Sequence, residues 1–218
     1  MLSLTTRFKI ILSVLAVILV TGSFIFYRSG DTPEGKNEIL IKALMQGLNT
    51  GHYQPEKVDD NFSKKVFKLY LQRLDFNKKF LMEPDVQKLR QYETAIDDEL
   101  RQGSFQFFDM SADLIEQRVK DSEAFYKEIL AQPFDFSKEE QIELDGDKLT
   151  YAKNKAELKE AWRKQLKYQT LVRLVDMQEE QQKKLEKDPK AEQKTFEQLE
   201  KEAREKVQKT YEDLYKRL

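Results

Sequence analysis

The fold can be read first from residues Phe62–Val86, FSKKVFKLYLQRLDFNKKFLMEPDV. Apolar side chains recur there at steps of three and four, which is the period of an amphipathic helix. One stripe consists of Phe62, Val66, Tyr70 and Leu74, and Phe67 and Leu71 widen it. A stripe this wide needs burial on more than one side. The spacing therefore predicts a helix from about Asp59 to Asp75 within an all-α, multi-helix bundle.

A second helix is predicted on the N-terminal side of this stretch. Its apolar positions are Ile39, Leu40, Ala43, Leu44 and Leu48, with Gly51 as a stop. Before it, Ser29–Lys36 (SGDTPEGK) has the composition of a linker. We therefore expect the folded domain to begin near Asn37.

The first thirty residues have the pattern of a membrane or export segment. Arg7 and Lys9 precede the apolar run Ile10–Tyr27, whose eighteen residues, at about 1.5 Å each, reach across a hydrocarbon core of roughly 30 Å. No A-x-A cleavage site follows, so we favour an uncleaved signal anchor over a cleaved signal peptide or a buried core helix. The preceding basic residues favour an inside N-terminus and export of the remainder, although Arg28 weakens the asymmetry.

Downstream, the helical pattern continues with one interruption. Pro84 is suited to a first helical turn, and the pattern that follows predicts a helix ending at Gly103. Ser104 is predicted to cap the next helix, which ends at Gln132-Pro133. The apolar positions of the two helices are Val86, Leu89, Tyr92, Ile96 and Leu100, and then Phe108, Ala112, Ile115, Val119, Phe125 and Ile129. Phe134–Thr150 lacks periodicity and is expected to wrap across the helices as an extended arm, anchored by Phe134 and Phe136.

Two cap-like pairs mark the remaining helices. Asn154 and Glu157 start a long helix, and Thr195 and Gln198 start another, with a bend expected at Asp188-Pro189 between them. The apolar residues are Leu158, Trp162, Leu166, Leu171, Val175 and Met177 in the first, and Phe196, Leu199, Ala203, Val207, Tyr211, Leu214 and Leu218 in the second. The predicted domains are residues 1–30 (signal), 31–36 (linker), 37–177 (helical domain) and 178–218 (charged helical extension).

The last stripe runs into Leu218 without a Gly, Asn or Pro to end it. An apolar final residue is unusual where chain ends fray. We interpret this as a truncation or an early stop within a longer protein; the alternative is a natural end with a docked helix.

No catalytic, cofactor-binding or metal-binding residue is predicted. His52 is the one histidine and the chain has no cysteine, which excludes a multi-histidine or thiolate metal site. Ser63-Lys64 and Ser137-Lys138 are sequence neighbours, whereas a Ser–Lys dyad needs a desolvated lysine facing the hydroxyl. Asp145-Gly146-Asp147 lacks the alternating ligands of a calcium loop, so a tight turn is expected.

Charge and aromatic content favour structural over binding roles. With 35% charged residues and a net charge of −1, the chain has no electrostatic preference for nucleic acid. The balanced charges of Gln178–Lys201 favour a solvated helix face over a docking surface. Core positions are favoured over a peptide groove for Phe105, Phe107, Phe108, Phe125, Tyr126 and Trp162.

Two blocks of the sequence resemble the N-terminal helical domain of the tail-specific, or carboxy-terminal-processing, periplasmic proteases. The first is His52-Tyr53 with Phe62–Val86, and its matching positions are Phe67, Tyr70-Leu71, Leu74-Asp75, Leu81 and Asp85-Val86. The second comprises Pro133-Phe134-Asp135-Phe136, Leu144-Asp145, Lys153–Leu158, Trp162 and Lys167. Together they span about residues 37–177.

The resemblance implies that this chain is the non-catalytic N-terminal region of an exported serine peptidase. Enzymes of this family recognise apolar C-terminal tails through a PDZ module and cut with a Ser–Lys dyad, and neither has a counterpart in this chain. The expected partners are the PDZ and catalytic core, protein substrates, an adaptor protein, and the membrane through Ile10–Tyr27. The expected location is the periplasmic face of the bacterial inner membrane, or the periplasm if the signal is cleaved. The alternative function is a membrane-anchored periplasmic scaffold or adaptor-binding protein without enzymatic activity.

Overall fold

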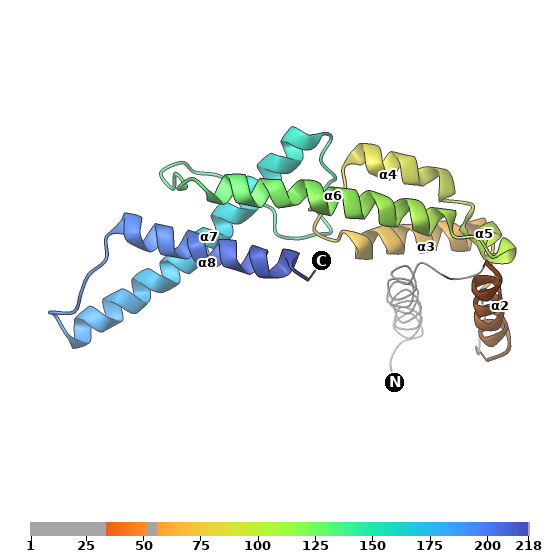
Figure 1. Cartoon of the computed structure of the whole chain (residues 1–218), viewed down its shortest axis with the longest axis horizontal. Helices are drawn as coiled ribbons and strands as arrows, with labels where there is room; N and C mark the ends of the chain where they lie inside the picture. Colours follow the sequence, from red (N-terminus) through yellow and green to blue (C-terminus); the bar gives the residue numbers. More distant parts are fainter. Residues whose placement is uncertain (1–33, 52–55, 218) are drawn as a thin grey trace. The chain divides into compact units, whose positions relative to one another are not determined.

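Every regular element of the described chain is a helix, which confirms the predicted all-α class (Figure 1). The structure is a computed structural model that describes residues 34–51 and 56–217. The predicted signal segment, Ile10–Tyr27, lies outside these residues. Over the described ranges, none of the helices combines the length and the apolar character that crossing a membrane requires.

The chain forms two compact units. The first consists of the described residues up to Leu74 together with Lys88–Ser111, and the second consists of Asp75–Gln87 and the residues from Ala112 onward. Helix α6, Gln106–Leu130, contributes its beginning to the first unit and its remainder to the second.

In the first unit, helix α2 is Glu34–Gly51 and helix α3 is Asp60–Leu74. Both helices were predicted, and Asp59 caps α3 by accepting hydrogen bonds from the backbone N–H groups of Asn61 and Phe62. The apolar side predicted to be buried on α2 is wrong, because a different side of the helix is buried. Ile39 and Leu40 are 68% and 53% exposed, and the buried residue is Ile41.

The single helix predicted from Pro84 to Gly103 is also wrong, because it is three elements. They are α4 Glu83–Leu89, the 3₁₀ turn η1 Arg90–Tyr92 and α5 Ile96–Gln102. The buried hydroxyl of Ser63 accepts the backbone N–H of Asp97 at 2.9 Å and donates to its carboxylate at 2.6 Å. This caps α5 from a distant part of the chain, which no local pattern reveals. The predicted stop is confirmed, since Gly103 has φ 71° in the left-handed region.

The predicted cap at Ser104 is wrong. The Ser104 hydroxyl is buried and has no hydrogen-bond partner among the described residues. The first turn of α6 is held instead by the carboxylate of Glu99, whose oxygens each lie 3.2 Å from the backbone nitrogen of Phe107. A carboxylate at this position also complements the helix dipole.

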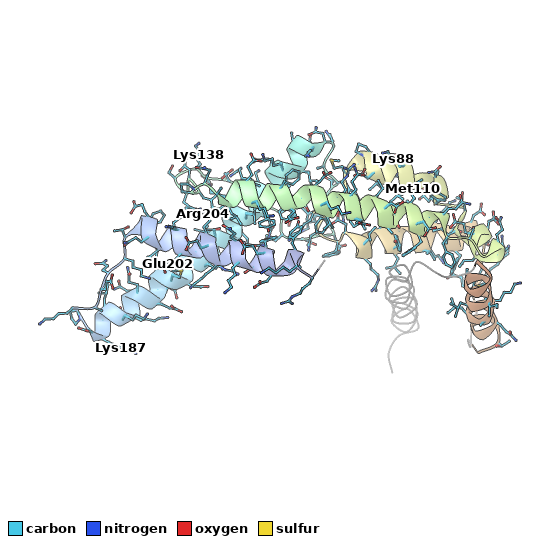
Figure 2. The ribbon with its side chains drawn as sticks, viewed as in Figure 1. Lys88, Met110, Lys138, Lys187, Glu202 and Arg204 are labelled. Carbon is cyan, nitrogen blue, oxygen red and sulfur yellow. The ribbon has the colours of Figure 1, made fainter. Side chains whose placement is uncertain are left out.

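The second unit is built on two helices that lie side by side, α7 Lys155–Lys187 and α8 Phe196–Tyr215 (Figure 1). The break expected at Asp188-Pro189 is confirmed, because α7 ends at Lys187. Helix α7 passes without interruption through the boundary expected at residue 177. Figure 2 shows Lys187 at the end of α7 and Glu202 and Arg204 on α8. Most side chains from 178 to 190 are exposed, as expected for a solvated face.

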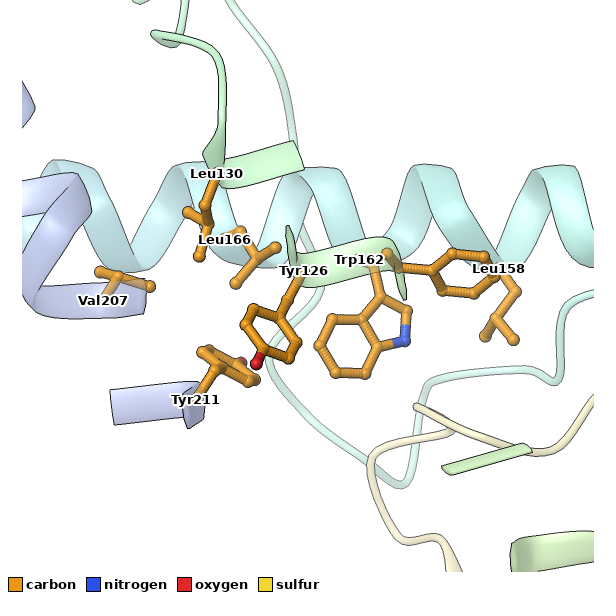
Figure 3. Close-up of a cluster of buried hydrophobic side chains, with 8 residues drawn as sticks. Tyr126, Leu130, Leu158, Trp162, Leu166, Val207 and Tyr211 are labelled. Carbon is orange, nitrogen blue, oxygen red and sulfur yellow. The ribbon is translucent and has the colours of Figure 1, made fainter. Parts of the chain in front are cut away.

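The main core of this unit joins α6, α7 and α8 (Figure 3). Its buried residues are Phe125, Tyr126, Leu130, Leu158, Trp162, Leu166, Val207 and Tyr211. The predicted α7 stripe is right up to Leu166, wrong at the next two positions, and right again at Met177, which packs against a smaller core cluster. Leu171 and Val175 are 40% and 42% exposed, and Thr170 and Leu174 are the buried residues.

Both predicted cap pairs are confirmed. The Asn154 side chain accepts the N–H of Glu157 at 3.0 Å, and the Glu157 carboxylate accepts the N–H of Lys153. Thr195 and Gln198 form a reciprocal capping box. The arm over residues 134–150 contains no helix, and half-buried Phe134 and Phe136 pack against the hydrophobic clusters, as predicted.

Candidate functional site around Trp162

Trp162 is the residue at which two distant segments of the second unit meet. Its indole is 3% exposed, and its Nε1–H donates to the backbone oxygen of Lys79 at 2.7 Å. The ring of Phe80 packs edge-on, with centroids 6.2 Å apart, and the ring of Tyr211 lies at 5.5 Å. Trp162 therefore fastens the segment after α3 to the middle of α7.

The loop after Asp75 is shaped by one buried carboxylate. Asp75 is 4% exposed and accepts the backbone N–H groups of Lys79, Phe80 and Leu81 at 2.8, 2.9 and 2.8 Å. Burial raises the pKa of Asp75, and the three N–H donors oppose that rise. The carboxylate thus fixes the loop whose Lys79 carbonyl receives the Trp162 indole.

Two further contacts hold the end of the first block. The backbone N–H of Glu83 donates to the carbonyl of Ala152 at 2.8 Å, beside a single parallel bridge between Met82 and Ala152. The fully buried carboxylate of Asp85 receives Nε and Nη2 of Arg118, each at 2.8 Å. This bidentate pair raises the pKa of the Arg118 guanidinium, chiefly through the hydrogen bonds that it donates to Asp85.

The arm is attached to α7 by ion pairs. Glu140 contacts both Arg163 and Lys167, and the Lys167 ammonium also lies 5.6 Å from the centroid of the Phe136 ring. Hydrogen bonds from Arg163 and then Lys167 lower the pKa of Glu140 to about 2. The arm is therefore held by charge at Glu140 and by apolar contact at Phe136.

A cavity of about 280 Å³ lies between this loop, the arm and α7. Its walls combine lysines, side-chain amides, one glutamate and apolar groups. They are Asn77, Lys78, Lys79, Gln141, Ile142, Glu143, Leu144, Leu149, Ala161, Trp162, Lys164 and Gln165.

The residue pairs weighed from the sequence are not brought together as catalytic groups. Ser63 is buried against Asp97, and its neighbour Lys64 is exposed. Ser137 and Lys138 each contact Asp135. His52 lies outside the described residues.

The turn expected at Asp145-Gly146-Asp147 is confirmed. The Asp145 carbonyl accepts the N–H groups of Lys148 and Leu149, and the Asp145 carboxylate accepts that of Asp147. Over the described part of the chain, no group of three or more His, Cys, Asp or Glu residues is arranged to hold a metal ion.

Sequence reasoning missed the lysines and amides of the cavity wall. Trp162 and Lys79, which join its sides, are separated by 83 positions. Solvated lysines and glutamines on a helix carry no local signal of such a contact. The one available hint was that Trp162 and the segment near Leu81 both belonged to blocks resembling one family.

Comparison with known proteins gives a specific match. The family model described as the tail-specific protease N-terminal domain matches residues 44–217. A tail-specific protease of Haemophilus influenzae is 29% identical over 128 residues, which are 58% of this chain and 18% of that protein. The chain thus matches less than a fifth of that relative's length.

Proposed function

Because the chain belongs to the family of tail-specific protease N-terminal domains, we propose that it is the non-catalytic helical region of an exported carboxy-terminal-processing serine peptidase. The observation that carries the proposal is the family match over residues 44–217, which includes both helices of the α7–α8 pair. In this account the intact enzyme cleaves proteins with apolar C-terminal tails, and the helical region contributes structure without cleaving bonds itself.

The partner in this proposal is the remainder of the protease, with its PDZ module and catalytic core. An exposed apolar stripe on α7 supports such a contact, since Leu171, Val172 and Val175 are each 40–42% exposed and lie within two helical turns. Neighbouring apolar side chains left on a helix surface are suited to burial by another folded part. An adaptor protein is a further partner of the same proposal.

The proposed location is the periplasmic face of the inner membrane, or the periplasm after signal cleavage. Support comes from the apolar run Ile10–Tyr27 and the basic residues before it. The same features support the second candidate function, a membrane-anchored scaffold or adaptor-binding protein without enzymatic activity.

An experiment in cells distinguishes the two functions. An exported reporter with an apolar C-terminal tail is expressed in a strain lacking this gene, which then receives either this chain or the chain extended through its downstream coding sequence. We expect the reporter to disappear only with the extended product. Persistence with both forms would favour the scaffold, and fractionation of the same cells tests the location.

A further inference from the structure

We propose that the cavity beside Trp162 binds an extended acidic peptide segment that inserts one apolar side chain. The inference concerns a site within the second unit and does not depend on whether the chain belongs to a peptidase. It rests on the charge of the cavity wall, on its side-chain amides and on its apolar floor.

The first observation is an excess of positive charge among the residues that line the cavity. Three lysines and one glutamate line the cavity, which gives a net formal charge of +2. Lys78 interacts electrostatically with Asp75, and Lys164 with Glu160, but each of these two carboxylates is already engaged, Asp75 by three backbone N–H groups and Glu160 by Arg163. The Glu143 carboxylate already accepts the backbone N–H groups of Leu144 and Asp145, at 2.9 and 2.8 Å. An anionic ligand is therefore favoured, since the cavity lining carries more ammonium groups than carboxylates.

The lysines lie over aromatic rings, which keeps them close to the cavity. The Lys79 ammonium lies 5.9 Å from the Trp162 ring centroid, and that of Lys78 lies 5.3 Å from the centroid of Tyr151. Lys78 also donates to the backbone oxygen of Phe76 at 2.9 Å. These contacts restrict the two cations through aromatic rings and one backbone oxygen, so both ammonium groups can still meet a ligand carboxylate.

The second observation is a set of amides suited to a peptide backbone. Asn77, Gln141 and Gln165 line the cavity, and their side-chain amides form no hydrogen bond within the part of the chain that the structure describes. Each amide offers both a donor and an acceptor. A peptide backbone presents the same alternation of N–H and C=O, whereas a free inorganic anion presents acceptors alone.

The third observation is the apolar floor. Ile142, Leu144 and Leu149 of the arm face the cavity together with the Trp162 indole. The indole N–H already donates to the backbone oxygen of Lys79, so Trp162 provides no free hydrogen-bond donor to the cavity. A volume of about 280 Å³ accommodates one large side chain with part of its backbone. The expected ligand is therefore a short peptide segment.

Trp162 is the one tryptophan of the chain, so its fluorescence reports on the cavity directly. The probe is acetyl-Asp-Leu-Asp-amide, titrated into the intact protein at low salt. We expect a saturable change in Trp162 emission that weakens as salt is added, because exposed charges are screened over a Debye length of about 10 Å at 0.1 M. Acetyl-Lys-Leu-Lys-amide and acetyl-Asp-Gly-Asp-amide should give no saturable change, and N-acetyl-leucine tests whether one terminal carboxylate is enough.

Matched variants locate the binding. Lys164→Ala should weaken the apparent affinity about tenfold, since one ion pair near a protein surface is lost. Lys183→Ala, on the same helix and away from the cavity, should leave it unchanged. Leu144→Ser should also weaken binding, with Leu40→Ser in the first unit as its matched control, since the two leucines are 52% and 53% exposed.

Several results would overturn the proposal. They are an equal response to the acidic and basic peptides, an equal effect of Lys164→Ala and Lys183→Ala, or no emission change with any peptide while circular dichroism shows a folded protein. Each of these outcomes leaves the proposed protease membership unaffected, because that proposal is tested by loss of a tailed reporter.

Discussion

A few residues, each with several partners, hold the second unit together. Trp162 unites packing and hydrogen bonding, since it is buried among α6, α7 and α8 and donates to the Lys79 carbonyl. Asp75 acts one step earlier, because it fixes the loop that presents this carbonyl. Stability of the unit should therefore depend strongly on both side chains and little on exposed residues of the same helices.

Replacing Trp162 with alanine should lower the free energy of unfolding by about 3–5 kcal/mol, because it leaves a cavity in the core and an unpaired carbonyl at Lys79. Urea denaturation followed by circular dichroism measures the change. Val172→Ala, on an exposed face of α7, should stay within about 0.5 kcal/mol of the parent. Equal midpoints for the two variants would contradict the assignment of Trp162 to the core.

Replacing Asp75 with alanine should cost about 2–4 kcal/mol, since three backbone N–H groups lose their acceptor, including that of buried Leu81. Asp75→Asn keeps one acceptor oxygen and should cost less. The same denaturation experiment compares them with Asp176→Ala on the exposed side of α7. A ranking in which asparagine is worse than alanine would mean that the carboxylate does not organise this loop.

At the scale of elements, the sequence predicts features whose cause is local. The helix starts at Asn154 and Thr195, the stop at Gly103 and the break near Pro189 were all predictable, because each depends on residues within one turn of the boundary. Elements positioned by distant residues were not predictable. The start of α5 is capped by Ser63, and the buried face of α7 shifts to Thr170 and Leu174 where it meets α8.

In the candidate site, too, features with a local cause were predictable and features set by distant residues were not. Trp162 was predicted as core from its helical spacing, and the arm was predicted from the loss of periodicity after Pro133. The cavity itself depends on Lys79 of the loop and Gln165 of α7 lining the same space, which only tertiary structure determines. Solvated residue types of this kind look alike on every exposed helix face.

The attachment of the arm to α7 should depend on pH. The pKa of Glu140 is lowered from 4.5 to about 2, so its ionised form stabilises the folded state. That contribution is present above the ordinary value of 4.5 and is lost as the pH falls from 4.5 toward 2. The melting-temperature difference between the parent and Glu140→Gln should therefore shrink across this range, as thermal scans from about pH 6 to pH 2 would show.

A suitable control for this experiment is Glu186→Gln, at the exposed end of α7. The melting-temperature difference between Glu186→Gln and the parent should stay small and vary little with pH. If the Glu140→Gln difference were constant across the same range, the ion pairs with Arg163 and Lys167 would not hold the arm in solution.

At the scale of the whole molecule, the chain is a helical protein of the tail-specific protease N-terminal domain family, and its match covers 18% of a known relative. Several of its buried polar groups form structural contacts, as Asp85 does with Arg118 and Ser63 does with Asp97. The central proposal is that this region supports proteolysis by a larger protein and cleaves no bonds itself.

The most direct test is a cleavage assay with purified proteins. A peptide with an apolar free C-terminus is incubated with this chain, with the product extended through the downstream coding sequence, and with an equimolar mixture of the two, and fragments are followed by mass spectrometry. The account predicts fragments from the extended product and from the mixture, and none from this chain alone. Cleavage by this chain alone would contradict it.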